Sequence, residues 1–209
     1  MAREPLGVKL TRLQMQKRSH HGLFIRPSLT RMPLPIQRHD DPFLPFSKAI
    51  IAATRDLVCA FIFDLGAYLS LGGAGAVALE RSIAFAAADA ATILHGPFRD
   101  DSFVEAAGDL GFNVDAVTVC SADLEAQYRR RVNRAVFLLD SGDHEHAALV
   151  PEMGSFRREK HWTCTYLTAS GETLSLEIMG DDIVYASVSE DFAEAARDTL
   201  LKAVAGGSR

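Results

Sequence analysis

The chain has 209 residues, of which 48% are apolar and 23% are charged, proportions typical of one compact globular domain. Its formal net charge of -5 excludes the basic field that general nucleic-acid binding requires. Charged residues interrupt the apolar stretches 49–60 and 74–93, so neither could cross a bilayer, and the N-terminus shows no secretory signal. We therefore expect a cytoplasmic protein with no nucleic-acid and no membrane partner.

The first 45 residues are basic and rich in proline, which predicts an N-terminal arm (1–45) with one short strand at 22–25. A single domain is expected to fill 46–209. It begins with a helix from Phe46, and the continuous apolar run that follows, 57–63, is typical of a strand buried on both faces.

Strands and helices then alternate up to residue 139. A helix is predicted at 77–85, where apolar residues recur at helical spacing after a run of glycines. The next elements are predicted as a strand at 90–94, a helix at 101–110, a strand at 116–120, a helix at 123–131 and a strand at 135–139. Such alternation with fully apolar strands indicates a parallel sheet covered by helices, either a barrel or an open doubly wound sheet.

The pattern changes after Asp140. Segments 162–168 and 172–178 alternate in polarity around a short turn, which predicts an antiparallel hairpin. A strand at 183–187 and an amphipathic helix at 191–204 are expected to end the fold. The predicted class is therefore α/β, with one antiparallel hairpin in the C-terminal third.

Two features of the sequence could form a ligand-binding loop or a reactive thiol, but a purely structural role is favoured for each. The glycines of 72–75 precede a helix, yet they lack the spacing of a nucleotide-binding loop, so a structural turn is preferred. The three cysteines, Cys59, Cys120 and Cys164, are widely spaced within apolar segments, which favours buried thiols over disulfides or a zinc ribbon. A nucleophilic cysteine is the less favoured alternative.

Three segments before residue 120 resemble the orotidine 5'-phosphate decarboxylases. They are DPFLPFSKAIIAATRDLVCA at 41–60, ALERSIAF at 78–85 and DAVTV at 115–119, in the family's order. The tail, IVYAS at 183–187 followed by EDFAEAAR at 190–197, is similar to the family's last strand and helix.

This resemblance implies a phosphate-binding (β/α)8 barrel, usually a homodimer, with its active site at the C-terminal ends of the strands. General barrel geometry places the chemistry at the same end. The stretch 141–180 is too short for two complete strand–helix units, so we expect a barrel that is remodelled or incomplete.

At the strand ends, residues of another chemical class match the family's ionic residues. Arg26 stands where the family's first strand ends in an aspartate, and Ile62 stands where its second strand ends in a lysine. In the third strand, His95 and Pro97 replace an aspartate and the proton-donating lysine. Asp100 matches the aspartate that the family contributes across its dimer.

The phosphate site is changed as well, since Asp181 stands where the resemblance implies an arginine. A carboxylate would repel a dianionic phosphate, and proline has no proton to donate. We therefore predict a pseudoenzyme, not an enzyme, with no intact catalytic or phosphate-binding residue, no cofactor and no binding of orotidine monophosphate or UMP. Its expected role is that of a homodimeric scaffold or protein-interaction module.

An enzyme of changed chemistry is the alternative. His95 could act as an acid or base at a barrel strand end, with Asp100 as its partner and Arg99 and Asp101 nearby. The simpler interpretation makes His95 a packed residue and the other three residues caps of the next helix.

Two further hypotheses concern the segment after residue 140. A metal could bind to His144, Glu145, His146 and His161, but a solvated loop is the simpler interpretation, so we predict no metal site. The hairpin that contains Trp162 and Tyr166 could expose a sheet edge to a protein partner.

Overall fold

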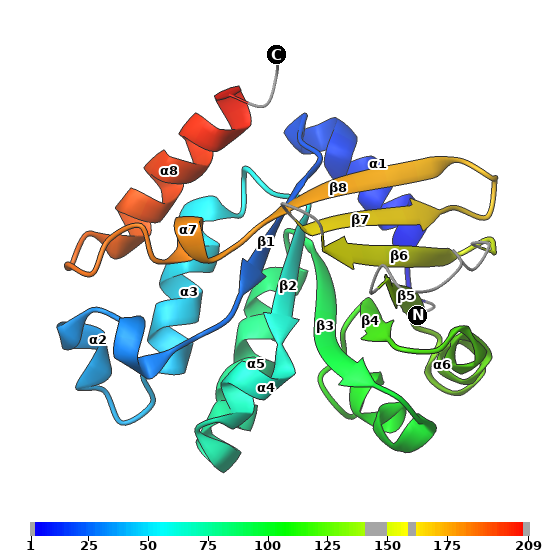
Figure 1. Cartoon of the computed structure of the whole chain (residues 1–209), viewed down its shortest axis with the longest axis horizontal. Helices are drawn as coiled ribbons and strands as arrows, with labels where there is room; N and C mark the ends of the chain where they lie inside the picture. Colours follow the sequence, from blue (N-terminus) through cyan, green and yellow to red (C-terminus); the bar gives the residue numbers. More distant parts are fainter. Residues whose placement is uncertain (1–2, 141–149, 159–161, 207–209) are drawn as a thin grey trace.

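The computed structural model of the chain describes residues 3–140, 150–158 and 162–206. Within these residues, eight strands form a closed barrel in which each strand pairs with the next and the last pairs with the first (Figure 1). The strands are β1 (His21–Ile25), β2 (Ala60–Asp64), β3 (Ala91–Phe98), β4 (Ala116–Val119), β5 (Ala135–Asp140), β6 (Met153–Arg158), β7 (Trp162–Leu167) and β8 (Thr173–Met179). None of the described helices is long and apolar enough to pass through a membrane.

One strand of the barrel runs opposite to the other seven. Strands β1 to β6 run parallel, β7 is antiparallel to both β6 and β8, and β8 is parallel to β1. The predicted α/β class and C-terminal hairpin are therefore confirmed. Of the two predicted alternatives, a remodelled barrel is confirmed by the reversed β7. An incomplete barrel is wrong, because β6, which no pattern indicated, pairs with β5 and β7 and completes the ring. Both sides of the hairpin are paired, so it exposes no sheet edge to a partner.

Helices cover the outside of the barrel, where α3 (Phe43–Thr54) packs against α5 (Gly72–Ala87) and α8 (Phe192–Gly206) (Figure 1). The other α-helices are α1 (Leu6–Lys17), α2 (Leu34–Gln37), α4 (Leu65–Leu69), α6 (Glu125–Val132) and α7 (Asp181–Val184). Short 3-10 turns lie at Leu29–Arg31, Asp101–Phe103, Glu105–Ala107 and Ala122–Leu124.

Two predicted elements are wrong. The helix expected at 101–110 consists of two 3-10 turns, since Gly108 is extended and ends the second of them. The strand expected at 183–187 is replaced by α7 and a loop, because β8 already pairs with β1 and no further strand fits into the ring.

Alternating strand residues divide the apolar core into two clusters. Phe24, Ile62 and Phe156 belong to the cluster that fills the barrel. Leu23 and Phe61, their neighbours in sequence, belong to the cluster between the barrel and the outer helices. The prediction of strands buried on both faces is confirmed by this arrangement.

Helix α1 covers the N-terminal end of the barrel. Its leucines at positions 6, 10 and 13 are buried in the same cluster as the barrel interior. Lys17 donates a hydrogen bond to the carbonyl oxygen of Val58 at 2.8 Å, and Lys9 pairs with Asp115, which directly precedes β4. The prediction of an arm with a single strand at 1–45 missed this helix. Its buried leucines recur at helical spacing, a signal that the proline-rich composition of the segment as a whole concealed.

Gly75 allows α5 to lie directly against α4. A Cβ atom added at Gly75 would overlap the carbonyl oxygen of Tyr68, whereas one added at Gly73 would meet no atom within 4 Å. Replacing Gly75 by alanine is therefore expected to lower the free energy of unfolding by about 1–3 kcal/mol. The matched control, Gly73→Ala, is expected to raise it by about 0.5–1 kcal/mol. Urea denaturation measures the free energy of unfolding of both variants. Equal stabilities of the two variants would show that α5 does not pack this closely against α4 at Gly75.

Candidate active site

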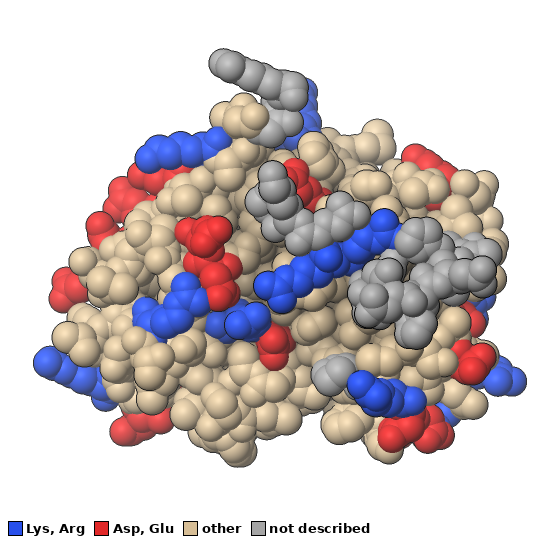
Figure 2. All heavy atoms as spheres, viewed as in Figure 1, with Lys and Arg blue, Asp and Glu red and all other residues tan. Residues whose placement is uncertain are grey.

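A pocket of about 560 Å³ lies at the C-terminal ends of β1 and β8, the end at which barrel enzymes place their active sites. Phe24 and Trp162 form part of its lining, together with the cationic side chains of Arg26 and Arg158. Figure 2 shows basic and acidic side chains gathered next to one another on the face that carries α7. The pocket therefore combines apolar rings with charges of both signs.

His95 lies in β3 beside this pocket, surrounded by aromatic rings. The centroid of its ring is 5.1 Å from that of Phe24, 5.3 Å from that of Phe156 and 5.9 Å from that of Trp162. Phe24 and Trp162 also line the pocket, so His95 lies next to the pocket although it is not one of its lining residues. The side chain is half-buried, so part of it remains accessible.

The hydroxyl of Thr118 holds the imidazole of His95 in position. It lies 3.2 Å from His95 Nδ1, 3.0 Å from the carbonyl oxygen of Gly96 and 3.1 Å from the Gly96 amide, which donates to it. The one hydroxyl proton can be donated to the Gly96 carbonyl or to Nδ1, so Thr118 can serve either tautomer of the ring.

Two charged side chains flank His95. Asp64 is its register partner at the end of β2, and one carboxylate oxygen of Asp64 caps α4 by accepting a hydrogen bond from the Ala67 amide at 2.8 Å. The other oxygen lies 3.9 Å from Arg26 Nε. Burial lowers the pKa of His95, the Asp64 carboxylate raises it, and Arg26 lowers it. The net direction is downward, so the ring is neutral at neutral pH.

A second ion pair lies at the edge of the pocket beside α7. Arg31 pairs with Asp181, and its guanidinium carbon lies 4.0 Å from the centre of the Tyr185 ring. The Tyr185 hydroxyl donates a hydrogen bond to the carbonyl oxygen of Arg26 at 2.7 Å. The charge of Asp181 is thereby compensated, and the backbone of Arg26 is held while its side chain stays 48% exposed.

Comparison with known proteins gives related sequences over part of the chain. No model of a protein family matches it. The orotidine 5'-phosphate decarboxylase of Herpetosiphon aurantiacus is 32% identical over 120 residues, which cover 54% of this chain and 45% of that protein. The enzyme of the same name from Thermomicrobium roseum is 39% identical over 74 residues, which cover 34% of this chain and 26% of that protein. The matched segments thus span between a quarter and a half of these curated relatives.

Solved structures extend the likeness to the whole fold. A Streptomyces avermitilis protein, provisionally named an orotidine 5'-phosphate decarboxylase, matches 99% of this chain and 96% of its own, with a TM-score of 0.65 and 15% identity. The OMP decarboxylase of Leishmania donovani matches 65% of this chain and 53% of its own, with a TM-score of 0.52 and 18% identity. The chain is orotidine 5'-phosphate decarboxylase-like.

The prediction that this decarboxylase-like chain is not an enzyme is overturned by these comparisons. The curated relatives carry the name of an enzyme, and the structural neighbours share its barrel. That prediction assumes that a chain without the family's catalytic residues has no catalytic activity. The same end of the barrel instead holds an oriented imidazole between two charged groups.

The structure brings Arg26, His95 and Asp181, positions suggested by the decarboxylase family, to one end of the barrel. Ile62 is fully buried inside it. Pro97 lies in β3 within the stretch between Leu94 and Phe98 where the register with β4 shifts. Asp100 is exposed, and its carboxylate accepts a hydrogen bond from the Ser102 amide at 2.9 Å, so it caps the next turn rather than orienting His95. Arg99 is exposed, and Asp101 pairs with Arg131 at 2.9 Å.

Three residues of this site were missed by the sequence analysis. Asp64 directly ends a predicted apolar strand, so the rule that barrel chemistry lies at strand ends could have found it. Thr118 sits inside a predicted strand and Trp162 begins the hairpin, and neither position carries a signal of its own. Their proximity to His95 depends on how the strands are aligned around the barrel.

Other residues singled out from the sequence lie away from this site or outside the described residues. The predicted loop cluster of His144, Glu145, His146 and His161 falls on residues that the structure does not describe. Cys59 and Cys164 are buried, and burial raises the pKa of the Cys59 thiol to about 11, which disfavours a nucleophile. Cys120 is exposed, so the expectation of three buried thiols is wrong for this residue, which follows the last position of β4.

Proposed function

We propose that this chain is an enzyme that transfers a proton through His95 on a small anionic substrate other than orotidine monophosphate. The observation that supports this proposal most is the placement of His95. The ring is half-buried at the C-terminal end of the barrel, it lies 3.2 Å from the Thr118 hydroxyl, and it packs against Phe24 and Trp162, which line a pocket large enough for a metabolite.

The chemistry open to His95 follows from its charge state. A neutral imidazole accepts a proton on its unprotonated nitrogen, and the imidazolium formed would be stabilised by the carboxylate of Asp64. The aromatic rings around it limit the access of water and fix the plane of the imidazole. These features favour general base catalysis over a purely structural role.

The charges around the pocket support an anionic substrate. Arg26 and Arg158 line the pocket, and both side chains are exposed. Arg158 also lies 5.3 Å from the centre of the Trp162 ring, an arrangement that holds the guanidinium over the apolar part of the lining. Arginine pairs with carboxylate or phosphate through two parallel hydrogen bonds.

Orotidine monophosphate itself is disfavoured as a substrate. The family resemblance implies a lysine as proton donor, but none of the described residues that line the pocket is a lysine. Asp181 lies in the lining where the resemblance implies an arginine, and it is paired with Arg31, so it supplies no donor for a nucleotide phosphate. Turnover of orotidine monophosphate and calorimetric titration with UMP test this point, and measurable decarboxylation would contradict the proposed change of chemistry.

Replacing Arg26 by alanine is expected to weaken the binding of the true substrate by about tenfold or more, since a charge-assisted bond contributes about 1.5–3 kcal/mol. A thermal-shift screen of small phosphates and carboxylates first finds compounds that stabilise the wild-type protein. Their affinity for Arg26→Ala and for the matched control Arg81→Ala, an exposed arginine on α5, is then measured by calorimetry. Equal affinity of Arg26→Ala and wild type would remove Arg26 from the site.

A homodimer, which the family resemblance implies, stays a prediction. Asp100 matches the residue that the family contributes across its dimer, and here it lies exposed on the surface of the single chain. It is therefore accessible to a second subunit.

A further inference from the structure

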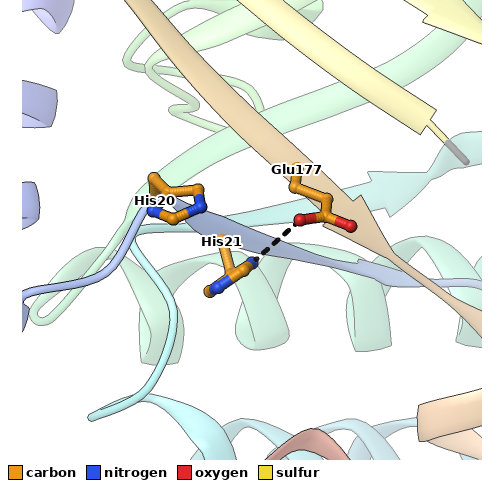
Figure 3. A group of neighbouring side chains, drawn as sticks. All are labelled: His20, His21 and Glu177. Atoms are coloured by element: carbon orange, nitrogen blue, oxygen red, sulfur yellow. Dashed lines mark ion pairs between the residues drawn. The ribbon is translucent and has the colours of Figure 1, made fainter. Parts of the chain in front are cut away.

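Two histidines and a glutamate meet where the first and last strands of the barrel pair. His20 directly precedes β1, His21 begins it, and Glu177 of β8 is the register partner of His21 (Figure 3). One ligand atom from each side chain lies within 4.8 Å of the others. Figure 3 shows the three side chains close together, with the His21 ring facing the Glu177 carboxylate.

The imidazole of His21 has an unsatisfied nitrogen. His21 is only 3% exposed, and its Nδ1 is buried without a hydrogen-bond partner among the described residues. The nearest carboxylate oxygen, Oε2 of Glu177, is 3.8 Å away, which is too far for a hydrogen bond. A buried polar atom left in this state costs about 1–3 kcal/mol, so a missing ligand is the expected explanation.

The place of His21 beside His20 suits metal binding. The buried Nδ1 of His21 has no hydrogen-bond partner among the described residues and lies next to a second imidazole. The rings of His20 and His21 lie side by side, with centroids 4.4 Å apart, so both can reach one ion.

We propose that His20, His21 and Glu177 bind one zinc ion, with a fourth position left for water. Two imidazoles and a carboxylate form a ligand set that zinc uses in proteins. In a tetrahedral site with bonds of about 2.0 Å, ligand atoms lie about 3.3 Å apart, so modest side-chain movement would close the set. The buried His21 supplies a fixed anchor, whereas His20 is exposed and the Glu177 side chain is 42% exposed, so both can move.

An ion at this place would connect β1 to β8 and so bind only the closed barrel. Glu177 also lines the 560 Å³ pocket, whereas His20 and His21 do not. The proposed site is independent of the proposed function, because it uses none of the residues assigned to proton transfer or to anion binding. It also differs from the loop histidines considered in the sequence, which lie in another segment.

Calorimetric titration of the tag-free full-length protein with zinc tests the proposal. One ion per chain is expected for the wild type, and zinc should raise its melting temperature. His20→Ala and Glu177→Gln are each expected to bind zinc about tenfold more weakly or worse and to lose the thermal shift. Both positions have exposed side chains, so these variants are expected to fold.

Two control variants locate the ion. His39→Ala removes an exposed histidine elsewhere, and the double variant His144→Ala, His146→Ala removes the loop histidines; both should bind zinc as the wild type does. The proposal is overturned if the wild type binds no zinc in a one-to-one ratio. It is equally overturned if His20→Ala and Glu177→Gln keep the wild-type affinity, or if the loop variant abolishes binding.

Discussion

Replacing His95 by glutamine is expected to lower kcat by about 10²- to 10⁴-fold, the usual contribution of a positioned acid or base. Glutamine keeps a polar side chain beside Thr118 but cannot take up a proton. The substrate for this measurement is the one found by the ligand screen described above. KM is expected to change little, since the anionic part of the substrate is assigned to Arg26 and Arg158.

The pH profile separates this role from a structural one. Because burial lowers the pKa of His95, the acid limb of kcat/KM should lie below the value of an ordinary histidine. Activity that needs the neutral ring is present above this pKa and is lost as the pH falls through it. His95→Gln should abolish this limb, whereas His39→Gln, the matched exchange at an exposed histidine, should keep both the rate and the profile. A His95→Gln enzyme with the wild-type rate would exclude proton transfer by this residue.

The sequence predicted most of the barrel because its first five strands are apolar on both faces. Such runs are recognisable without knowledge of the neighbours, and β1 to β5 lie where they were expected. The hairpin was also recognisable, since β7 and β8 alternate in burial along their length. The sequence pattern therefore predicts a strand correctly where the strand is buried on both faces or where its side chains alternate strictly between buried and exposed.

Strand β6 could not be predicted, because it depends on partners distant in sequence. The segment Met153–Arg158 ends in two arginines, and it becomes a strand only because β5 and β7 both offer it hydrogen bonds. Helix α1 could have been predicted from the helical spacing of its leucines, but its place over the end of a barrel that the chain builds later could not.

The candidate active site also depends on contacts that the sequence alone does not reveal. The family resemblance pointed to His95, but it suggested Asp100 as the acidic partner from proximity along the chain. In the folded protein, the register of β2 and β3 makes Asp64 the neighbour of His95, and Asp100 faces solvent. The strand register therefore determines which carboxylate shifts the pKa of the His95 imidazole. A single sequence does not reveal that register.

Asp115 is the residue whose loss should destabilise the fold most. Its carboxylate is only 6% exposed and forms salt bridges of 2.8 Å with both Arg3 and Lys9. It also accepts hydrogen bonds from the amide of Thr92 at 2.8 Å and from its hydroxyl at 3.1 Å. One carboxylate thus holds the N-terminal segment with α1 against the starts of β3 and β4.

Replacing Asp115 by alanine is expected to lower the free energy of unfolding by about 3–5 kcal/mol, because the Lys9 ammonium and the Thr92 amide lose their partner in a largely buried place. Urea denaturation measures the loss. Asp89→Ala is the matched control: its pair with Arg55 spans 3.0 Å but is exposed, so a loss of less than about 1 kcal/mol is expected.

Acid should weaken the same contact. Burial alone would raise the pKa of Asp115, but the charges of Lys9 and Arg3 and the hydrogen bonds it accepts outweigh burial and lower the pKa in the folded state. A carboxyl group with a lowered folded pKa stabilises the protein above its unfolded pKa, and this stabilisation is lost as the pH falls through the folded pKa. The stability of Asp115→Ala should therefore fall less steeply with acid than that of the wild type. Parallel curves for the two proteins, or a loss no larger than that of Asp89→Ala, would mean that α1 is held by its leucines alone.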